Sequence, residues 1–395
     1  MLLPPLLALV PRGAAPLAAV AGLCAVGLCA VGLISGDPLR RLAALRFPAA
    51  MLGLLLLWGG VSALWAIDPW RSLLMEARLA GLFAAGLALA AASGSIAAPR
   101  RLAFLAIAGT GLAVIVAWYE LGTGGGISRY VTERNFAPPR LNQIAVWLAI
   151  LLLPLAALLV CRSRTLLGAL AAGAITGTVY LLDGTAAKTA LALSLPVAAL
   201  LYFRRRIVAR LAAALSVVAV LTAPLTLPRL ADSAAVFESA DAFKQSFGHR
   251  LLIWDFAGKR IAERPVLGWG LDSARAIPGG KDQIRPGQEW LPLHPHNAAL
   301  QLWLELGAPG AVLFALFLGW LWLRLAAVAW PRLYAAAAGG SLAAISAVAF
   351  AGWGIWQEWW LATLALAAFA IAVTARAAAE RATRRLPRGS RACGR

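Results

Sequence analysis

Charged residues are scarce in this sequence. They make up 13% of 395 residues, whereas 61% are hydrophobic and the mean hydropathy is +0.78. A water-soluble fold cannot bury this much apolar surface, so the composition excludes a soluble protein and makes the bilayer the solvent. A helix needs about 20 mostly apolar residues to cross the hydrocarbon core. The composition therefore predicts an all-α polytopic integral membrane protein.

Cysteine and histidine are also rare. The chain has four cysteines, and none of them lies in residues 229–297, the only long hydrophilic stretch. A disulfide or a cysteine metal site is therefore excluded there. All three histidines, His249, His294 and His296, do lie in this stretch. A zinc site formed by the three histidines is the open alternative. A His-x-His run with proline between the histidines is weak evidence for such a site, so we favour a site without metal or cofactor.

Eleven apolar runs are long enough, or nearly so, to cross a membrane. Leu2–Val10 is shorter and contains Pro4 and Pro5, so it is either a twelfth helix or an interfacial segment. We expect about twelve transmembrane helices. The eleven runs are 14–34, 47–66, 72–93, 102–121, 141–160, 165–182, 186–203, 207–227, 298–323, 334–350 and 355–374.

The net charge of +19 comes largely from basic residues in the connections between these runs. It therefore indicates membrane topology rather than nucleic-acid binding. Alternate connections, together with the tail from Arg376, hold 20 of the 36 basic residues and only two of the 17 acidic ones. This is the positive-inside pattern, which places those connections and the C-terminus in the cytoplasm. Residues 229–297 then lie in the periplasm of a bacterial inner-membrane protein, and the basic tail contacts anionic lipid.

Four regions follow from this topology. Residues 1–228 hold transmembrane helices 1 to 9, and 229–297 form a large, partly helical periplasmic loop between the ninth and tenth helices. Residues 298–374 hold helices 10 to 12, and 375–395 form a basic cytoplasmic tail. The apolar runs have nearly no ionisable residues inside them, so the chemistry is expected in the loop. A solute transporter, which usually has polar groups near the membrane midplane, is the less favoured class.

The end of the hydrophilic stretch contains clear helix signals. Residues 247–263 read as a helix ended by Pro265, with Arg250 and Trp254 on one face. Asn297 is a typical N-cap for a short helix that closes at Gly307. Four further tryptophans, at positions 353, 356, 359 and 360, are typical of an aromatic belt at the membrane surface.

Two motifs in this region resemble a known family. His296-Asn297, nine residues and then Gly307-Ala308-Pro309-Gly310 is similar to the H-[NSQ]-x9-G-x-x-G signature of the O-antigen ligase and O-antigen polymerase superfamily. Arg250-x-x-x-Trp254 and the segment 264–270 resemble the pattern ahead of that histidine. The similarity covers about residues 246–312.

The resemblance implies a metal-independent, inverting membrane glycosyltransferase. Its donor would be a glycan linked to undecaprenyl diphosphate, His296 would be the general base, and Arg250 would bind the diphosphate. Members of the family usually have a second arginine at the outer start of an earlier helix, where this sequence has Lys188. The charge is kept, but the bidentate guanidinium is lost. Three residues are expected to support the site: His294, Asn297 and Glu305.

Within this superfamily we favour an O-antigen ligase, which would transfer polysaccharide to lipid A-core at the periplasmic face. The alternative is an O-antigen or exopolysaccharide polymerase that joins repeat units on the same carrier. A protein O-oligosaccharyltransferase is less favoured, because no added external domain is present in the sequence. The expected partners are the carrier-linked donor, the lipid acceptor and membrane lipids, with no nucleic acid.

Overall fold

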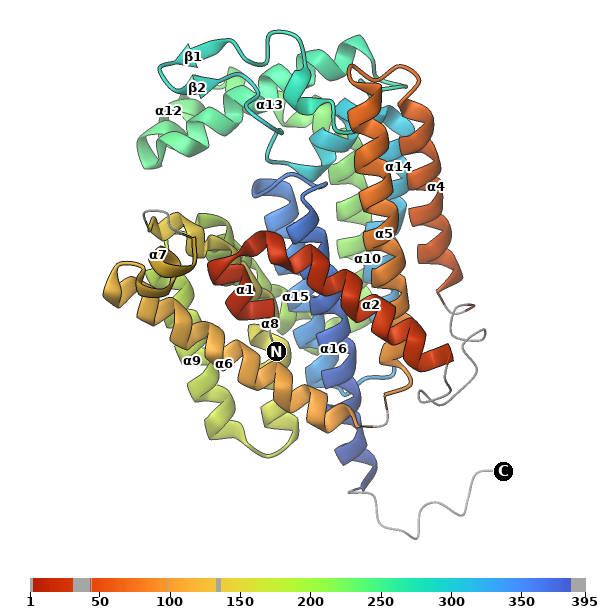
Figure 1. The fold of residues 1–395 in the computed structure, drawn as a ribbon, viewed down its shortest axis with the longest axis vertical. Helices are drawn as coiled ribbons and strands as arrows, with labels where there is room; N and C mark the ends of the chain where they lie inside the picture. The colour runs from red at the N-terminus through yellow and green to blue at the C-terminus, as the bar shows by residue number, and fades with distance from the viewer. Residues whose placement is uncertain (1–2, 31–42, 44, 97, 133–135, 385–395) are drawn as a thin grey trace.

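The protein is a bundle of long helices with a smaller polar layer at one end (Figure 1). This computed structural model describes residues 3–30, 43, 45–96, 98–132 and 136–384. Strands occur within that part only as one antiparallel pair, β1 (Gln283–Arg285) with β2 (Gln288–Glu289). The predicted all-α membrane architecture is confirmed at this level.

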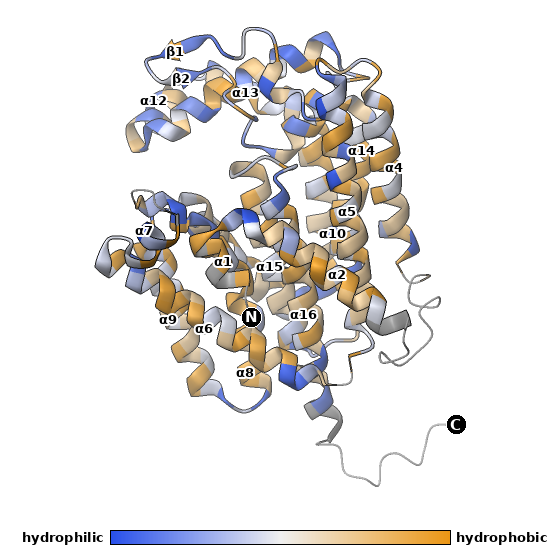
Figure 2. Cartoon of the chain, viewed as in Figure 1, coloured by the Kyte–Doolittle hydropathy of each residue, from blue (hydrophilic) through white to orange (hydrophobic). Residues whose placement is uncertain are grey.

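Seven helices of the described part are long and apolar enough to cross a membrane. Figure 2 shows their predominantly hydrophobic colouring. They are α5 (Pro69–Ser93), α6 (Pro99–Thr123), α8 (Asn142–Cys161), α10 (Thr185–Thr226), α14 (Ala298–Ala327), α15 (Arg332–Ala351) and α16 (Glu358–Arg384). Shorter apolar helices are α2 (Ala14–Ala30), α4 (Arg46–Ser62) and α9 (Thr165–Leu181). The remaining short elements of the bundle are α1 (Leu3–Leu9), η1 (Pro11–Gly13), α7 (Gly126–Thr132) and η2 (Pro138–Leu141).

The helix α10 is a hairpin of two membrane-length halves. Its backbone leaves the helical region at Arg204, where φ is −133° and ψ is 48°. Both of its ends face the polar layer: the Lys244 ammonium donates to the Thr185 hydroxyl at 3.2 Å, and Gly258 packs against Pro224. Each half, of about 20 residues, is about 30 Å long. The two predicted runs 186–203 and 207–227 therefore correspond to two helices joined at Arg204.

The helices differ from the expected apolar runs near both ends of the described chain. The helix α1 has seven residues and a length of about 10 Å, which is too short to cross a bilayer. The count of about twelve transmembrane helices therefore stays a prediction. The boundary at residue 374 falls inside α16, which continues to Arg384 because residues 375–384 are rich in alanine and other strong helix formers. The rest of the predicted tail, residues 385–395, lies outside the described residues.

The centre of the bundle is α8. Nearly all of its side chains from Ile144 to Leu159 are buried, and it packs against α9, α15 and α16. The two halves of α10 pack against α14 and α15. These contacts bring the starts of α10 and α14 and the end of α15 to the same end of the molecule, beneath the polar layer.

We call residues 228–297 the cap. It contains α11 (Pro228–Asp232), α12 (Ala234–Phe243), α13 (Gln245–Glu263), η3 (Ala274–Ala276) and the strand pair, and Figure 2 shows its hydrophilic colouring. The apolar side of α13 is buried through Leu251, Ile253 and Ile261. The predicted helix at 247–263 is thus confirmed, and it begins two residues earlier than expected.

Backbone hydrogen bonds join the cap to a break in α14. Gly307 has φ 62° and ψ −158°, which interrupts the helix and leaves carbonyl oxygens free to accept. The N–H groups of Trp269 and Gly270 donate to Leu304 and Glu305 at 2.9 and 2.8 Å, and that of Ala308 donates to Pro265 at 2.9 Å. A Cβ atom on Gly307 would lie 2.1 Å from the Val266 carbonyl oxygen, so only glycine fits this contact.

Candidate active site

His296 lies just before α14 in a conformation that fixes its ring. Its φ of 55° is in the left-handed region, which few residues other than glycine adopt. Its Nδ1 atom is 2.6 Å from the Gly352 carbonyl oxygen. A carbonyl oxygen can only accept a hydrogen bond, so the ring proton is on Nδ1 and the lone pair is on Nε2. The half-buried ring is therefore set up to accept a proton at Nε2.

Asn297 holds the next position in the chain. Its Oδ1 atom accepts from the Leu300 N–H at 3.0 Å, and its Nδ2 atom donates to the Phe350 carbonyl at 2.9 Å. The first bond is the predicted N-cap of α14. The second ties the start of α14 to the end of α15, only two residues before the carbonyl that holds His296.

His294 supports the same loop from inside. Its Nδ1 atom faces the His296 N–H, and its Nε2 atom faces the Gly354 N–H, each at 3.2 Å. A neutral imidazole can accept at only one of these two nitrogens, and a second ring proton would remove that acceptor, so the arrangement favours an uncharged His294. Burial, followed by the charges of His296, Arg275 and Arg250, lowers its pKa to about 3.

The protonation state of His296 follows from its surroundings. Burial lowers its pKa to about 4, opposed by the bond to Gly352 and aided by the charges of Arg250 and His249. An ordinary histidine has a pKa of about 6.5. His296 is therefore uncharged at neutral pH, as a general base must be.

The lowered pKa of His296 predicts an unusual pH profile. Proton acceptance requires the neutral ring, so activity that depends on it is fully present above the ordinary histidine pKa and falls only as the pH drops through about 4. We expect the initial transfer rate to stay near its plateau from pH 7.5 down to about pH 5.5. Initial rates of the purified protein in micelles would test this, and a midpoint near pH 6.5 would contradict it.

Arg250 presents an unpaired guanidinium near this loop. Its charge lowers the pKa of both His294 and His296, and it lies over the Phe247 ring, 5.6 Å from the centroid. The two acids that could have paired with it on α13, Asp255 and Glu263, bind Lys259 and Arg260 instead. Within the described part of the chain no carboxylate pairs with Arg250, so it is free to bind an anion.

Trp254 connects α13 to the histidine loop. Its indole N–H donates to the Pro295 carbonyl at 2.9 Å. Arg250 lies one helical turn earlier, as the i, i+4 spacing predicted. The indole bond therefore sets the distance of the Arg250 turn from the loop.

Lys188 lies in the first turn of α10, and its side chain is half-buried. It has no acidic partner among the residues that the structure describes. The bond between Lys244 and Thr185 brings this turn next to the start of α13.

Glu305 is fully buried beneath the histidine loop. Its carboxylate accepts from the Trp356 indole at 2.6 Å, the Asp272 N–H at 2.7 Å and the Gln301 amide at 3.0 Å. The solvated alternative is therefore excluded, and Glu305 contacts neither an arginine nor a histidine directly. It is connected to the histidine loop through Gln301, whose Oε1 atom accepts from the Ile355 N–H at 2.9 Å, beside the Gly354 that faces His294.

Sequence reasoning missed a charged group below this carboxylate. Asp272 is 5% exposed and pairs with Arg71 of α5 at 2.7 Å and with Arg275 at 3.2 Å. The expected aromatic belt was also wrong for Trp356 and Trp360, which are 3% and 2% exposed and lie in the core. Only the acidic residue at position 272 in a polar loop could have indicated the Asp272 ion pairs. Nothing in the residue spacing indicated the hydrogen bond from the Trp356 indole to Glu305.

The histidines are not arranged as a metal site. His249 has its Nε2 atom 2.8 Å from the Glu289 carbonyl oxygen, away from the other two rings' hydrogen bonds. Over the described ranges, no group of three histidine, cysteine, aspartate or glutamate side chains is placed to hold a metal ion.

Comparison with known proteins supports the family that the motifs around His296 indicate. Residues 170–315, which include Lys188, Arg250 and His296, match the family model described as O-antigen ligase. The predicted resemblance to the O-antigen ligase superfamily is confirmed. Relatives in Rickettsia conorii and Rickettsia prowazekii, both named "Putative polysaccharide ligase", are 36% identical over 126 residues and 29% identical over 180 residues. These matches cover 31% and 43% of this chain, and 30% and 43% of the relatives' own length.

Proposed function

We propose that the protein is an O-antigen ligase, a glycosyltransferase that moves polysaccharide from an undecaprenyl diphosphate carrier to a lipid A-core acceptor at the periplasmic face of the inner membrane. The observation that carries this proposal is the 2.6 Å contact between His296 Nδ1 and the Gly352 carbonyl oxygen, which leaves Nε2 as the proton acceptor of the neutral ring. The family match and the unpaired Arg250 support the same reaction.

The proposed reaction needs only two kinds of group. His296 Nε2 takes the proton of the acceptor hydroxyl as the hydroxyl oxygen attacks the anomeric carbon of the donor sugar. The bond from that carbon to the diphosphate oxygen breaks on the opposite face, which inverts the configuration. Arg250 and Lys188 stabilise the negative charge that develops on the diphosphate. The imidazolium formed returns its proton to solvent, and no metal is required.

The cap supports a membrane-anchored donor in this scheme. It covers the bundle end where α10 and α14 begin, so a lipid-borne diphosphate at the membrane surface would meet Arg250 from above and Lys188 from the bundle. The polymerase alternative uses the same groups, because only its acceptor differs.

The test compares the host lacking this protein with the same host expressing it, by lipopolysaccharide gel and by analysis of carrier-linked glycan. A ligase predicts loss of all O-antigen from lipid A-core with accumulation of carrier-linked polymer. A single repeat left on the core would show a polymerase instead. An unchanged ladder in the deletion host would contradict both proposals.

Substitutions at Arg250 separate charge from geometry. We expect Arg250→Lys to reduce kcat/KM for the carrier-linked donor by about 10- to 100-fold, because lysine keeps the charge but loses the bidentate fork. Lys188→Arg should leave activity equal or raised. The matched control is Arg264→Lys. In the wild type, the Arg264 Cζ atom lies 4.1 Å from the Trp269 ring centroid, outside the histidine cluster. Equal losses at 250 and 264 would contradict the assignment of Arg250.

A further inference from the structure

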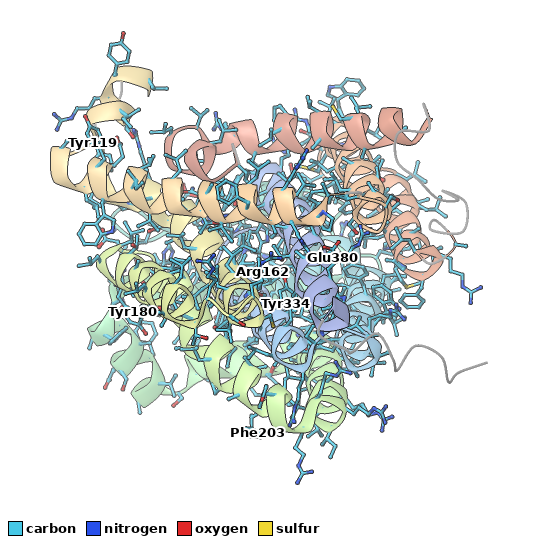
Figure 3. The ribbon with its side chains drawn as sticks, turned by 90° about the horizontal axis from the view of Figure 1, so that it is seen from below. Tyr119, Arg162, Tyr180, Phe203, Tyr334 and Glu380 are labelled. Atoms are coloured by element: carbon cyan, nitrogen blue, oxygen red, sulfur yellow. The ribbon has the colours of Figure 1, made fainter. Side chains whose placement is uncertain are left out.

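A basic cavity lies at the end of the bundle opposite the cap. It is a shallow cavity, widely open to the surface, of about 520 Å³ at the tip of the α10 hairpin and at the connection between α14 and α15. Figure 3, seen from that end, shows Phe203 at this tip. The lining includes Arg204, Arg205, Arg206 and Arg332 together with the aromatic residues Tyr202 and Trp330. None of the described residues that line it is acidic.

The hairpin geometry explains why these arginines gather. The helix breaks at Arg204, so three consecutive guanidinium groups are placed around the turn instead of spreading around a continuous helix. None of the three has a hydrogen bond or ion pair within the part of the chain that the structure describes. Their charges are therefore available to a ligand, and their mutual repulsion favours one that is anionic.

Arg332 forms the fixed wall of the cavity. Its guanidinium donates to the carbonyls of Tyr202 and Phe203 at the end of the first half of α10, and its Cζ lies 4.5 Å from the Tyr202 ring centroid. These acceptors are neutral, so the positive charge of Arg332 is not cancelled. Trp330 packs on Tyr334 at a centroid distance of 5.8 Å and closes the other side.

The position of the cavity selects the class of ligand. Each half of α10 has the length of the hydrocarbon core, so the tip lies at the membrane surface. Indole and phenol rings prefer this depth, where glycerol and ester groups of lipids lie. Guanidinium groups bind phosphate oxygens bidentately. The combination of four cations with an aromatic, lipid-facing rim suits a phosphate that carries acyl chains better than a soluble anion.

We propose that this cavity binds a phospholipid of the cardiolipin class, which carries two separate phosphate groups. Four guanidinium groups can contact two phosphates, with two groups for each phosphate, and basic pockets between helices on one membrane surface bind such head groups. The site is separated from the candidate active site by the length of the bundle, so the proposal does not depend on the proposed glycosyl transfer. Its expected role is to hold the α10 hairpin and the α14–α15 connection together.

Native mass spectrometry of the full chain in micelles would test the proposal. Cardiolipin should bind more tightly than phosphatidylglycerol, and phosphatidylcholine should not bind. The triple variant Arg204→Gln, Arg205→Gln, Arg206→Gln should bind cardiolipin about 100-fold more weakly, given roughly 1 kcal/mol per basic residue at a membrane surface. The control triple variant Arg101→Gln, Arg164→Gln, Arg210→Gln removes the same charge from residues outside the cavity lining and should change binding less than about threefold.

A charge-preserving variant keeps the test valid if the glutamine variant inserts badly. With lysine at positions 204, 205 and 206 the topology signal remains, and cardiolipin binding should still weaken about tenfold because the bidentate contacts are lost. Equal weakening in the glutamine variant and its control would overturn the proposal. So would competition by inorganic phosphate at the same concentration as cardiolipin, since this would identify a soluble anion site.

Discussion

Replacing His296 with asparagine is expected to abolish glycan transfer. The rate of the purified protein should fall by about 10²- to 10⁴-fold, because the general base is lost. Asparagine is the preferred substitution because it adopts the left-handed conformation, with φ near 55°, better than most residues. In the native host, lipid A-core should lose its O-antigen ladder while carrier-linked polymer accumulates.

His249→Asn is the matched control for this experiment. It removes a histidine from the same cap, and its ring contacts only the Glu289 carbonyl among the hydrogen bonds of the described residues. We expect the control to keep its activity within about threefold. A His296→Asn protein that is folded and still transfers glycan at the normal rate would remove His296 from the mechanism.

Replacing Glu305 with alanine is expected to destabilise the whole cap-facing end of the bundle. The substitution leaves the Trp356 indole, the Asp272 N–H and the Gln301 amide without their acceptor in a fully buried site. Each buried unsatisfied group costs about 1–3 kcal/mol, so the total loss is roughly 3–9 kcal/mol. Thermal unfolding in micelles, followed by tryptophan fluorescence, should show a Tm lower by about 5 °C or more.

Two variants sharpen the Glu305 experiment. Glu263→Ala removes a carboxylate of the same size from the surface, where the Glu263 side chain is 45% exposed and pairs with Arg260. It should lower the free energy of unfolding by less than about 1 kcal/mol. Glu305→Gln keeps one acceptor oxygen and should recover part of the lost Tm. If Glu305→Ala were as stable as the wild type, the buried hydrogen bonds would not support the histidine loop.

The sequence predicted the local features of this protein well. Apolar runs of about 20 residues located the helices because a membrane helix must satisfy its backbone internally and present apolar side chains to lipid. The Asn297 cap and the Gly307 break were predictable because each depends on residues within one or two turns. The charged run at 204–206 likewise marked the tip of the α10 hairpin between two apolar halves.

The features that the sequence did not predict all depend on contacts between segments far apart in the chain. Arg71 and Asp272 are separated by 201 residues, and Glu305 and Trp356 by 51, so no local pattern could pair them. The tryptophans near 356 have the composition of a membrane belt, and only the packing of α16 against the core decides which of them are buried. The tautomer of His296 was also beyond prediction, since it depends on the Gly352 carbonyl, 56 residues away.

The backbone bonds across the Gly307 break mean that the cap has no independent existence as a soluble domain. Excised as residues 228–297, it would lose the Leu304 and Glu305 carbonyls that accept from Trp269 and Gly270, as well as the buried carboxylate that accepts from Asp272. Those donors would then have to be satisfied by water, and the turn at 268–270 would lose the contact that shapes it. Antibodies or inhibitors raised against an isolated cap peptide should therefore recognise the native protein poorly, whereas selection on the full chain in a lipid environment would present the assembled surface.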